Sequence, residues 1–332
     1  MIEMTFCGTS HGAEGYRGTI SGLPLGYKID INLINEQLRR RKSSLGRGAR
    51  ASIETDLVEL SGLDTDNKIV GDLSFYVANS SNAISMPLPI TAVRSGHADL
   101  VGARRYCVNN ARQVCELASA RSSVAYVVTG AICKQILLRQ GISTSSIVKS
   151  VGGVSGDAIK DKIIEVMAQG DSVGGIVTIK GRGVRMSLLG GDFQNYSQRL
   201  DARIASAMLG IPSVKGIEFG IGGKYSTCLG SECADLLTLD CNGDIIYATN
   251  NCGGIVAGLS TGQDIEFDLT VKPVPTIKKQ IDTLDLITKQ NTLSHYERAD
   301  VCVVESVGVI AENILATTIL NEIIERNVLI EG

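Results

Sequence analysis

Two of the three histidines stand in short polar segments that also contain glycine. His11 lies in GTSHG and His97 lies in RSGHAD, and the third histidine is His295. An imidazole titrates near neutral pH, so it can donate or accept a proton during a reaction at physiological pH. A single loop histidine is more often solvated or bonded to the backbone. Two such segments in one chain favour proton-transfer chemistry.

A second chemical feature is the stretch LRRRKSSLGRGAR at 38–50, which places six basic side chains within thirteen residues. Guanidinium groups bind carboxylates and phosphates with two parallel hydrogen bonds, so the stretch predicts an anion site. The whole chain carries a formal net charge of −3, only 4% aromatic residues and no Trp. Because a nucleic-acid surface needs a positive field or stacking side chains, nucleic-acid binding through this stretch is the lowest-ranked alternative.

Two common nucleotide-binding motifs are not present. GIGGKYS at 220–226 resembles part of a phosphate loop, but the first required glycine falls on Glu218 and Tyr225 follows Lys224. No GxGxxG follows a predicted strand and opens a helix, so a Rossmann dinucleotide site is unsupported. Any nucleotide must therefore be held by another scaffold.

The nine cysteines are an odd number without a repeated close pair, which predicts free thiols. Cys228 and Cys233 lack the partners of a tetrahedral zinc set, so we predict no metal site. The amino terminus MIEMTFCGTSHG has no apolar segment of a signal peptide, and no run approaches eighteen uninterrupted apolar residues. We therefore expect a cytoplasmic protein without membrane contact.

The elements around these segments follow from the hydrophobic pattern. Residues 19–41 predict a strand, a glycine-bounded turn and a helix that begins near Asp30. The basic stretch thus begins at the carboxyl end of a helix, where the helix dipole favours cations, and continues into a loop.

Further strands are expected at 56–63, 71–79, 147–154, 174–184 and 263–275, further helices at 112–140, 157–170, 199–211 and 309–327, and a hairpin around 242–244. The strands and helices do not alternate regularly, and the sequence contains no repeat or linker. The pattern predicts one α+β domain over residues 1–332.

Seven segments in collinear order resemble the chorismate synthase family. GTSHG is similar to the family's GESHG, RSGHADLVGARRY to RPGHADLxGAxKY, and RRRKSSLGRGARASIETD to RRxxGxGRGxRMxIExD. In the second half, RLDARIASAMLGIPSVKG resembles KLDAxLAxAxMSIxAVKG, NNCGGIVAGLSTG resembles NNAGGIxGGxSNG, KPVPT resembles KPIPT, and RADVCVV resembles RHDPCVV. The chain is identified as a divergent member of this family.

The resemblance implies a lyase of the shikimate pathway, on the route to the aromatic amino acids. Its reaction converts 5-enolpyruvylshikimate 3-phosphate into chorismate and phosphate by a 1,4-elimination that requires reduced FMN without net oxidation. The implied fold is a single-domain β-α-β sandwich, and the implied assembly is a homotetramer. Some members use NADPH to reduce the flavin. The substrate carries two carboxylates and a phosphate, which suits an arginine-lined cavity.

The same resemblance assigns roles to residues of this chain. His11 would protonate the departing phosphate, Ser10 would orient His11, His97 would lie near flavin N1, and Asp300 would take a proton at flavin N5. The residues expected to bind FMN are Ala118, Ser119, Arg121, Pro212, Ser213, Ala257, Lys272, Pro273, Val274, Pro275, Thr276 and Arg298. Arg41, Arg47 and Arg50 would bind substrate, and Arg41 and Arg47 match positions assigned to NADPH.

The chain departs from the family pattern at several functional positions. Ala299 replaces the histidine of RHD, Ser306 replaces an arginine expected to bind substrate, and Leu117 and Ser122 replace charged residues of RASARET. These changes leave open the alternative of a degenerate flavin- or anion-binding paralogue without turnover. Because the proposed proton-transfer residues His11, His97 and Asp300 are all present, we favour a working enzyme.

Overall fold

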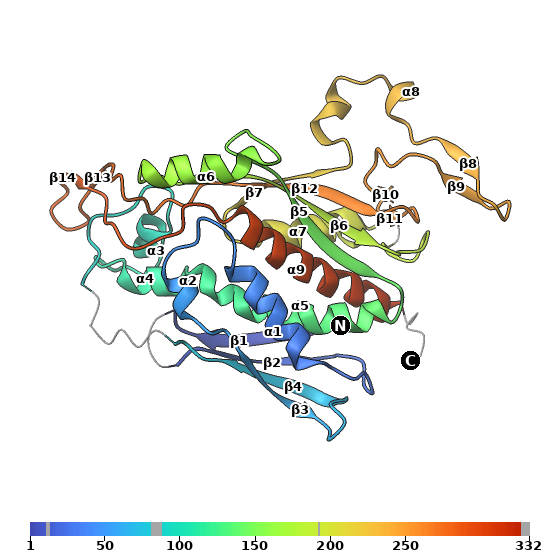
Figure 1. Ribbon diagram of the computed structural model, residues 1–332, viewed down its shortest axis with the longest axis horizontal. Coiled ribbons are helices and arrows are strands. Elements are labelled where there is room, and N and C mark those ends of the chain that lie inside the picture. Colours follow the sequence, from blue (N-terminus) through green and yellow to red (C-terminus); the bar gives the residue numbers. More distant parts are fainter. Residues whose placement is uncertain (11–13, 81–87, 192, 327–332) are drawn as a thin grey trace.

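The structure is a computed structural model that describes residues 1–10, 14–80, 88–191 and 193–326. Two four-stranded antiparallel sheets form the outer layers (Figure 1). The first sheet has the order β1 (Glu3–Gly8), β2 (Tyr16–Ser21), β4 (Ile69–Val77) and β3 (Val58–Leu63). The second sheet has the order β5 (Ser143–Val151), β6 (Gly175–Arg182), β12 (Ile265–Val271) and β7 (Val214–Phe219).

Helices form the layer between the sheets (Figure 1). The helices α1 (Ile31–Lys42) and α5 (Ser123–Leu138) pack on the first sheet, and α9 (Val304–Glu325) packs between α5 and the second sheet. The helix α7 (Leu200–Leu209) lies beside α9 against β7. The predicted α+β sandwich is therefore confirmed.

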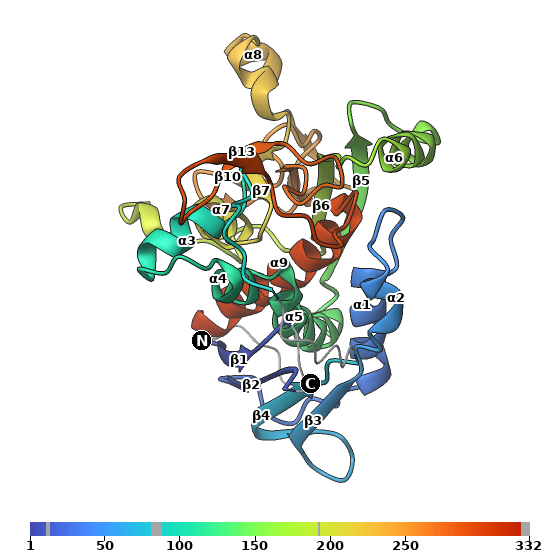
Figure 2. The same ribbon diagram turned by 90° about the vertical axis from the view of Figure 1, so that its left-hand side faces the viewer.

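Shorter elements surround this sandwich (Figures 1 and 2). They are the helices α2 (Arg50–Ile53), α3 (Asp99–Arg105), α4 (Arg112–Leu117), α6 (Ala158–Ala168) and α8 (Gly230–Cys233), the 3-10 turns at Ala120–Ser122, Tyr196–Gln198 and Gly222–Ser226, and the strand pairs β8 (Leu237–Leu239) with β9 (Ile245–Tyr247), β10 (Ile255–Val256) with β11 (Leu259–Ser260), and β13 (Asp282–Leu284) with β14 (Asn291–Leu293). The predicted hairpin around 242–244 is the β8–β9 pair.

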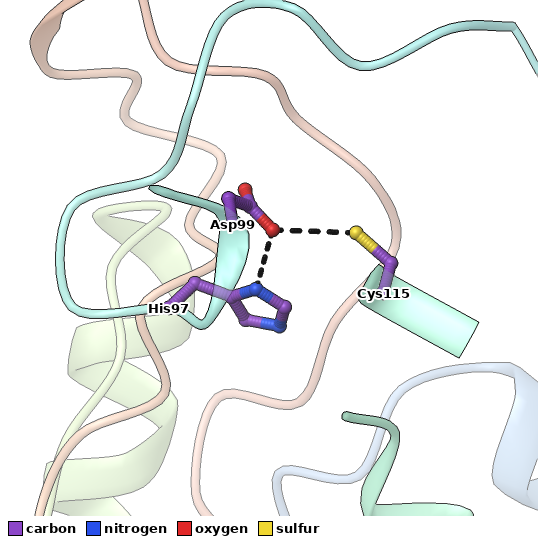
Figure 3. Close-up of side chains that lie close together, drawn as sticks. All are labelled: His97, Asp99 and Cys115. Carbon is purple, nitrogen blue, oxygen red and sulfur yellow. Dashed lines mark hydrogen bonds and ion pairs between the residues drawn. The ribbon is translucent and has the colours of Figure 1, made fainter. Parts of the chain in front are cut away.

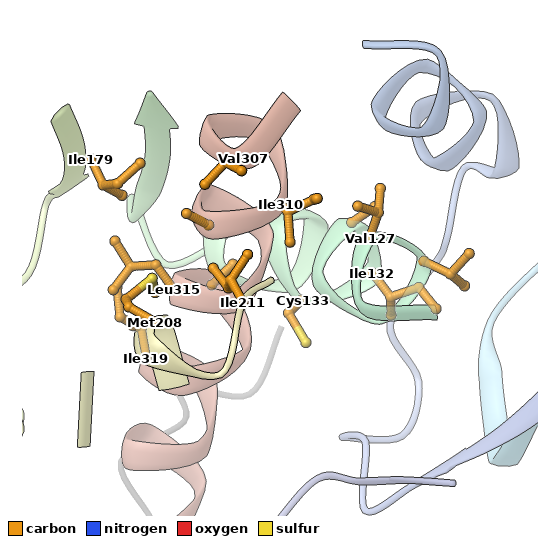
Figure 4. Packing of buried hydrophobic residues seen from close by; sticks show 14 of the residues in the cluster. Val127, Ile132, Cys133, Ile179, Met208, Ile211, Val307, Ile310, Leu315 and Ile319 are labelled. Carbon is orange, nitrogen blue, oxygen red and sulfur yellow. The ribbon is translucent and has the colours of Figure 1, made fainter. Parts of the chain in front are cut away.

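One contiguous hydrophobic core includes residues of both sheets and of the central helices. Figure 4 shows Ile179 of β6 and Met208 of α7 on one side of α9, and Val127 of α5 on the other. By length and composition α9 could cross a membrane, but 72% of its most apolar window is buried inside the protein. Its apolar character is thus explained by its position in the core.

Two predicted helix boundaries were wrong. The expected helix at 112–140 is divided, because α4 ends at Leu117 and α5 begins only at Ser123. Ser119 between them has an extended backbone, and its hydroxyl accepts a hydrogen bond from the Arg121 N–H. A serine that bonds to nearby backbone competes with helix propagation. The carboxyl-terminal helix begins at Val304 rather than at residue 309.

Candidate active site

The basic stretch ends α1 and then leads into a buried ion-pair cluster. Arg41, in the last turn of α1, is only 4% exposed. Its Nη2 donates to Asp56 Oδ2 at 2.7 Å, and its Nη1 donates to Ser123 Oγ at 3.0 Å. Arg121 Nη1 donates to the other oxygen of Asp56 at 2.7 Å, and Arg121 Nε donates to Asn79 Oδ1 at 2.6 Å. Two buried guanidinium groups therefore share one carboxylate.

The charges of this cluster shift one another's titration. Burial acts to raise the pKa of Asp56, but Arg41 and Arg121 outweigh it, so the pKa is lowered. Burial lowers the pKa of the Arg41 guanidinium; Asp56 opposes this, whereas the positive charges of Arg47 and Arg121 add to it. Within the described residues, Arg41 Nε and Arg47 Nε are buried and have no hydrogen-bond partner. Such donors suit an anionic ligand.

Ser10 lies next to this cluster. It is 1% exposed, and its hydroxyl accepts hydrogen bonds from Arg50 Nη1 at 3.0 Å and from Ser119 Oγ at 2.8 Å. Arg50 also donates to the Ser10 carbonyl and pairs with Glu54 at 3.0 Å. The structure thus brings together Ser10, Ser119 and Arg50, three residues to which the resemblance assigns separate roles. His11 lies outside the described residues.

Asp300 is held by the loop that continues the basic stretch. Arg47 Nη1 lies 2.9 Å from Asp300 Oδ2, and the Gly48 N–H donates to Asp300 Oδ1 at 2.6 Å. The Val301 N–H also donates to the Gly46 carbonyl at 2.7 Å. The loop is therefore bonded both to the carboxylate and to the backbone that follows it.

His97 occupies a second polar cluster, at the start of α3 (Figure 3). Its Nδ1 lies 2.6 Å from Asp99 Oδ1, and Arg94 forms two hydrogen bonds to the same carboxylate through its side chain, each 2.8 Å long. Arg94 Nη1 also donates to Thr276 Oγ1 at 3.0 Å. Lys272 Nζ donates to the Gly96 carbonyl at 2.8 Å. The loop of His97 therefore contacts the expected FMN segment 272–276.

Donor atoms of His97, Asp99 and Cys115 lie within 4.8 Å of one another, close enough to bind a metal ion. However, Arg94 Nη2 lies 3.2 Å from His97 Nδ1, 2.8 Å from Asp99 Oδ1 and 2.6 Å from Cys115 Sγ. The guanidinium already supplies the positive charge among these atoms. Burial also raises the pKa of Cys115 to about 12, so its sulfur is a thiol and a poor metal ligand. The cluster is better described as an ion-pair network.

The other expected cofactor-binding residues are partly gathered near His97. The Lys272 N–H donates to the Ser213 carbonyl at 2.8 Å, which joins segments 212–213 and 272–276. Ser213 and Ala257 have left-handed backbones with φ of 74° and 52°. Non-glycine residues in this region are strained and cluster at ligand sites. Ala257, however, lies in the turn between β10 and β11, close to the start of β12. Lys272 follows the end of β12, so these two residues lie at opposite ends of this strand.

The remaining residues of the expected FMN site differ in exposure. Ala118, Pro212, Pro273 and Arg298 are exposed, Val274 and Pro275 are half-buried, and Thr276 is buried. Thus Ser119 and Arg121 belong to the group around Ser10, and segments 212–213 and 272–276 belong to the group around His97. Among the contacts of the described residues, none joins Ala257 or Arg298 to either group.

The departures from the family pattern also have a structural setting. Ser306 is 2% exposed, and its hydroxyl donates to the Arg41 carbonyl at 2.6 Å. Next to it lies a cavity of about 180 Å³ whose lining includes Arg40 and Glu305. Arg40 pairs there with the fully buried Glu312 at 2.5 Å.

Several functional residues were missed from the sequence. Arg94 and Asp99 belong to the RSGHAD segment, but neither was predicted to act with His97. Asp56 and Asn79 anchor Arg121, and Asp56 has a left-handed backbone with φ of 50°. A signal for Asp56 was available, because it is the final aspartate of the family pattern RRxxGxGRGxRMxIExD, but the pattern does not show which side chains it contacts.

Comparisons with known proteins bear on this geometry. The family model described as chorismate synthase matches residues 2–324. The chorismate synthase of Exiguobacterium sp. is 34% identical to this chain, in an alignment that covers 96% of this chain and 92% of the relative. That of Clostridium tetani is also 34% identical, and its alignment covers 98% of this chain and 93% of the relative. A crystal structure of chorismate synthase superposes with a TM-score of 0.78 over 98% of this chain and 92% of that chain, at 24% identity. The chain therefore belongs to the chorismate synthase family.

Proposed function

We propose that this protein is a working chorismate synthase that converts 5-enolpyruvylshikimate 3-phosphate into chorismate and phosphate. The observation that carries the proposal is the convergence of Arg41, Arg50 and Arg121, from three separate segments, around Ser10 and Asp56. A substrate with two carboxylates and a phosphate needs several guanidinium donors in one place.

The residues present fit a phosphate-bearing flavin. Ser119, Thr276 and Lys272 offer hydroxyl and ammonium groups, and Ser213 and Ala257 have the strained backbones found at ligand sites. Reduced FMN, when bound, supplies electron density that assists loss of phosphate without net oxidation. The segments proposed to hold it are 118–121, 212–213 and 272–276, and Ala257 and Arg298 are added on the family resemblance alone.

The proposed steps combine the roles that the family resemblance implies with the contacts of the described residues. His11 protonates the departing phosphate, and Ser10, fixed by Arg50 and Ser119, orients His11. Arg41 and Arg121 are proposed to hold the substrate's anionic groups. Together with Arg50 they bring three positive charges to the two carboxylates of Asp56 and Glu54, and this excess of positive charge supports the role. Asp300, oriented by Arg47 and Gly48, is the proposed proton acceptor, and His97 would support the charge that forms near the cofactor by exchanging a proton through its ring.

An anaerobic assay tests the proposal directly. Photoreduced FMN is mixed with the protein and 5-enolpyruvylshikimate 3-phosphate, and phosphate and chorismate are measured. We expect turnover by the wild type and its loss in His11→Ala and His97→Ala, with Arg39→Ala as a matched control because Arg39 is exposed and pairs only with Glu36 among the contacts of the described residues. A parallel assay with NADPH and oxidised FMN tests whether the chain reduces its own flavin.

The competing hypothesis is a degenerate paralogue that binds flavin or anions without turnover. The contacts of Ser306 support this alternative. Arg41 meets Ser306 only through its backbone carbonyl, because its guanidinium bonds to Asp56 and Ser123. The family's arginine at this position therefore has no direct replacement from Arg41. FMN binding without phosphate release would support the paralogue and contradict the enzyme.

We further propose that the protein acts in the cytoplasm on a small-molecule substrate as a homotetramer. A nucleic-acid role loses its basis, because Arg41 is buried while Arg47 and Arg50 pair with Asp300 and Glu54.

A further inference from the structure

We propose that Asp99 and Arg94 are positioning residues that keep the proton of neutral His97 on Nδ1 and leave Nε2 as the nitrogen that exchanges protons in the active site. The catalytic consequence of this tautomer rests on the proposed function. The tautomer itself follows from the hydrogen bonds of this cluster and can be measured without any assay of turnover.

The Asp99 carboxylate is fully buried and accepts hydrogen bonds on both oxygens. Its Oδ2 receives the Arg94 backbone N–H at 3.0 Å and Arg94 Nε at 2.8 Å. Its Oδ1 receives Arg94 Nη2 at 2.8 Å and the Cys115 thiol at 3.3 Å, and it lies 2.6 Å from His97 Nδ1. Every other contact of Oδ1 is therefore with a donor.

These contacts define the protonation of Asp99. Burial alone would raise the pKa of this carboxyl, but its hydrogen bonds to Arg94 and His97 reverse the effect and lower the pKa far below its usual value. The group is thus a carboxylate, which accepts hydrogen bonds and has no proton to donate.

The short contact between His97 and Asp99 must therefore use a proton on Nδ1. In a neutral imidazole only one ring nitrogen carries a proton, so Nε2 is left unprotonated. Arg94 Nη2 lies 3.2 Å from Nδ1 and, as a donor, would by itself favour the opposite tautomer. Its two hydrogens, however, are directed to Asp99 Oδ1 and Cys115 Sγ, so the shorter contact with the Asp99 carboxylate decides the tautomer. Figure 3 shows the second ring nitrogen pointing away from Asp99.

Arg94 keeps the carboxylate in this orientation. It is 5% exposed, and besides Asp99 it bonds to Thr276 Oγ1 at 3.0 Å. Because Thr276 belongs to an expected FMN segment, the same guanidinium links the orientation of His97 to the cofactor region. This arrangement resembles the carboxylate that fixes the histidine tautomer in serine proteases.

The asparagine variant of Asp99 has a predictable effect. Two Arg94 donors, one of them backbone, point at Oδ2, so the amide oxygen of Asp99→Asn is expected to take that position. Its NH₂ group then faces His97 and donates to Nδ1. The neutral ring is forced to carry its proton on Nε2, which is the opposite tautomer.

Magic-angle-spinning NMR of sedimented protein labelled with ¹⁵N-histidine tests the proposal. The chain has only three histidines, and the His97→Gln variant identifies the signals of His97. At a pH where the ring is neutral, we expect a protonated Nδ1 and an unprotonated Nε2 in the wild type. A neutral ring protonated on Nε2 in the wild type overturns the proposal.

The variants then connect the tautomer to catalysis. In Asp99→Asn we expect protonation to move to Nε2 and kcat to fall by about 100-fold or more with little change in KM, because a misplaced proton removes acid–base function and not binding. Cys115→Ala is the matched control, since it removes one donor to Asp99 without changing the charge, and it should keep the wild-type tautomer. Thermal melting shows whether each variant is folded.

The outcomes separate this inference from the proposed function. A wild type with the Nδ1–H tautomer but without phosphate release would contradict the enzyme and leave the positioning of His97 in place. A folded Asp99→Asn variant with the altered tautomer and unchanged kcat would show that the positioning has no catalytic consequence and would overturn the inference.

Discussion

At the scale of single residues, the arginines of the basic stretch differ in burial and in the acidic residues that they pair with. Arg39 keeps 61% of its side chain exposed and pairs with Glu36 on the same helix. Arg47, with 18% exposed, pairs with the proposed proton acceptor Asp300. Exposed pairs contribute little, whereas partly buried charged hydrogen bonds are worth about 1.5–3 kcal/mol.

Arg47→Ala should therefore lower kcat/KM by about 10- to 100-fold, because Asp300 loses one of two donors that fix its orientation. Arg39→Ala should leave kcat/KM within about twofold of the wild type. Steady-state kinetics of both variants under anaerobic conditions checks the prediction. Equal effects of the two substitutions would show that the contact with Asp300 is unimportant.

Asp56 makes stability depend on pH. Its pKa is lowered in the folded state, because the attraction of Arg41 and Arg121 outweighs the opposing effect of burial. A lowered folded pKa stabilises the protein at pH values above the unfolded pKa of about 3.9, and this stabilisation is lost as pH falls through the folded value.

We expect the free energy of unfolding to decrease progressively below about pH 4, and Asp56→Asn to weaken that dependence while also lowering stability at pH 7. Urea titrations at pH 7, 5, 4 and 3 measure this. Asp30→Asn, which retains an N-cap side chain at the start of α1, is the matched control. An Asp56→Asn protein with the full wild-type acid dependence would refute the assignment.

Sequence reasoning identified the proposed reactive residues more readily than their partners. Ser10, His97, Arg121 and Asp300 stand within recognisable segments, so their positions could be transferred from the family pattern. Asp56 ends the motif RASIETD, but its role could not be recognised, because that role depends on a left-handed backbone and on two arginines that reach it from different segments. Such convergence is a property of the fold.

At the scale of elements, the central helices pack closely enough to require glycine. A Cβ built on Gly130 of α5 would lie 2.3 Å from the Asn313 carbonyl oxygen and 2.4 Å from Asn313 Cβ in α9. Both elements were expected to be helical, but the hydrophobic pattern gave no indication of this crossing point. Close approach of two backbones leaves no room for a side chain.

Gly130→Ala should therefore destabilise the protein by about 1–3 kcal/mol, since α5 and α9 must move apart to accept the methyl group. Gly71→Ala in β4 is the matched control, because its Cβ would meet nothing within 4 Å and its backbone needs no left-handed conformation. Chemical denaturation of both variants tests this. Stability equal to the wild type in Gly130→Ala would contradict the close approach of α5 and α9 at this position.

At the scale of the whole molecule, we propose that residues 1–332 form one domain, because a single hydrophobic core joins both sheets through α1, α5 and α9. One segment extends away from this body. Figures 1 and 2 show α8 projecting from the sandwich, and Figure 1 shows the β8–β9 hairpin extending with it. We call residues 222–250 the arm.

The arm exposes apolar side chains that a monomer would leave in water. Leu237 and Leu239 of β8 are 63% and 64% exposed, and Ile245 of β9 is 65% exposed. A two-stranded hairpin is marginally stable by itself in water and usually packs against another surface. We expect a second copy of this chain to supply that surface, in agreement with the homotetramer implied by the family resemblance.

The purified protein should therefore elute with a mass near four times that of the 35.2 kDa chain when measured by light scattering after size exclusion. The double substitution Leu237→Glu and Leu239→Glu should reduce this mass, because charges on the arm oppose burial of the leucines. Leu25→Glu is the matched control, since Leu25 is also 63% exposed but lies in the turn before α1. A monomeric wild type, or a double variant that keeps the full assembly, would show that the arm does not join the subunits.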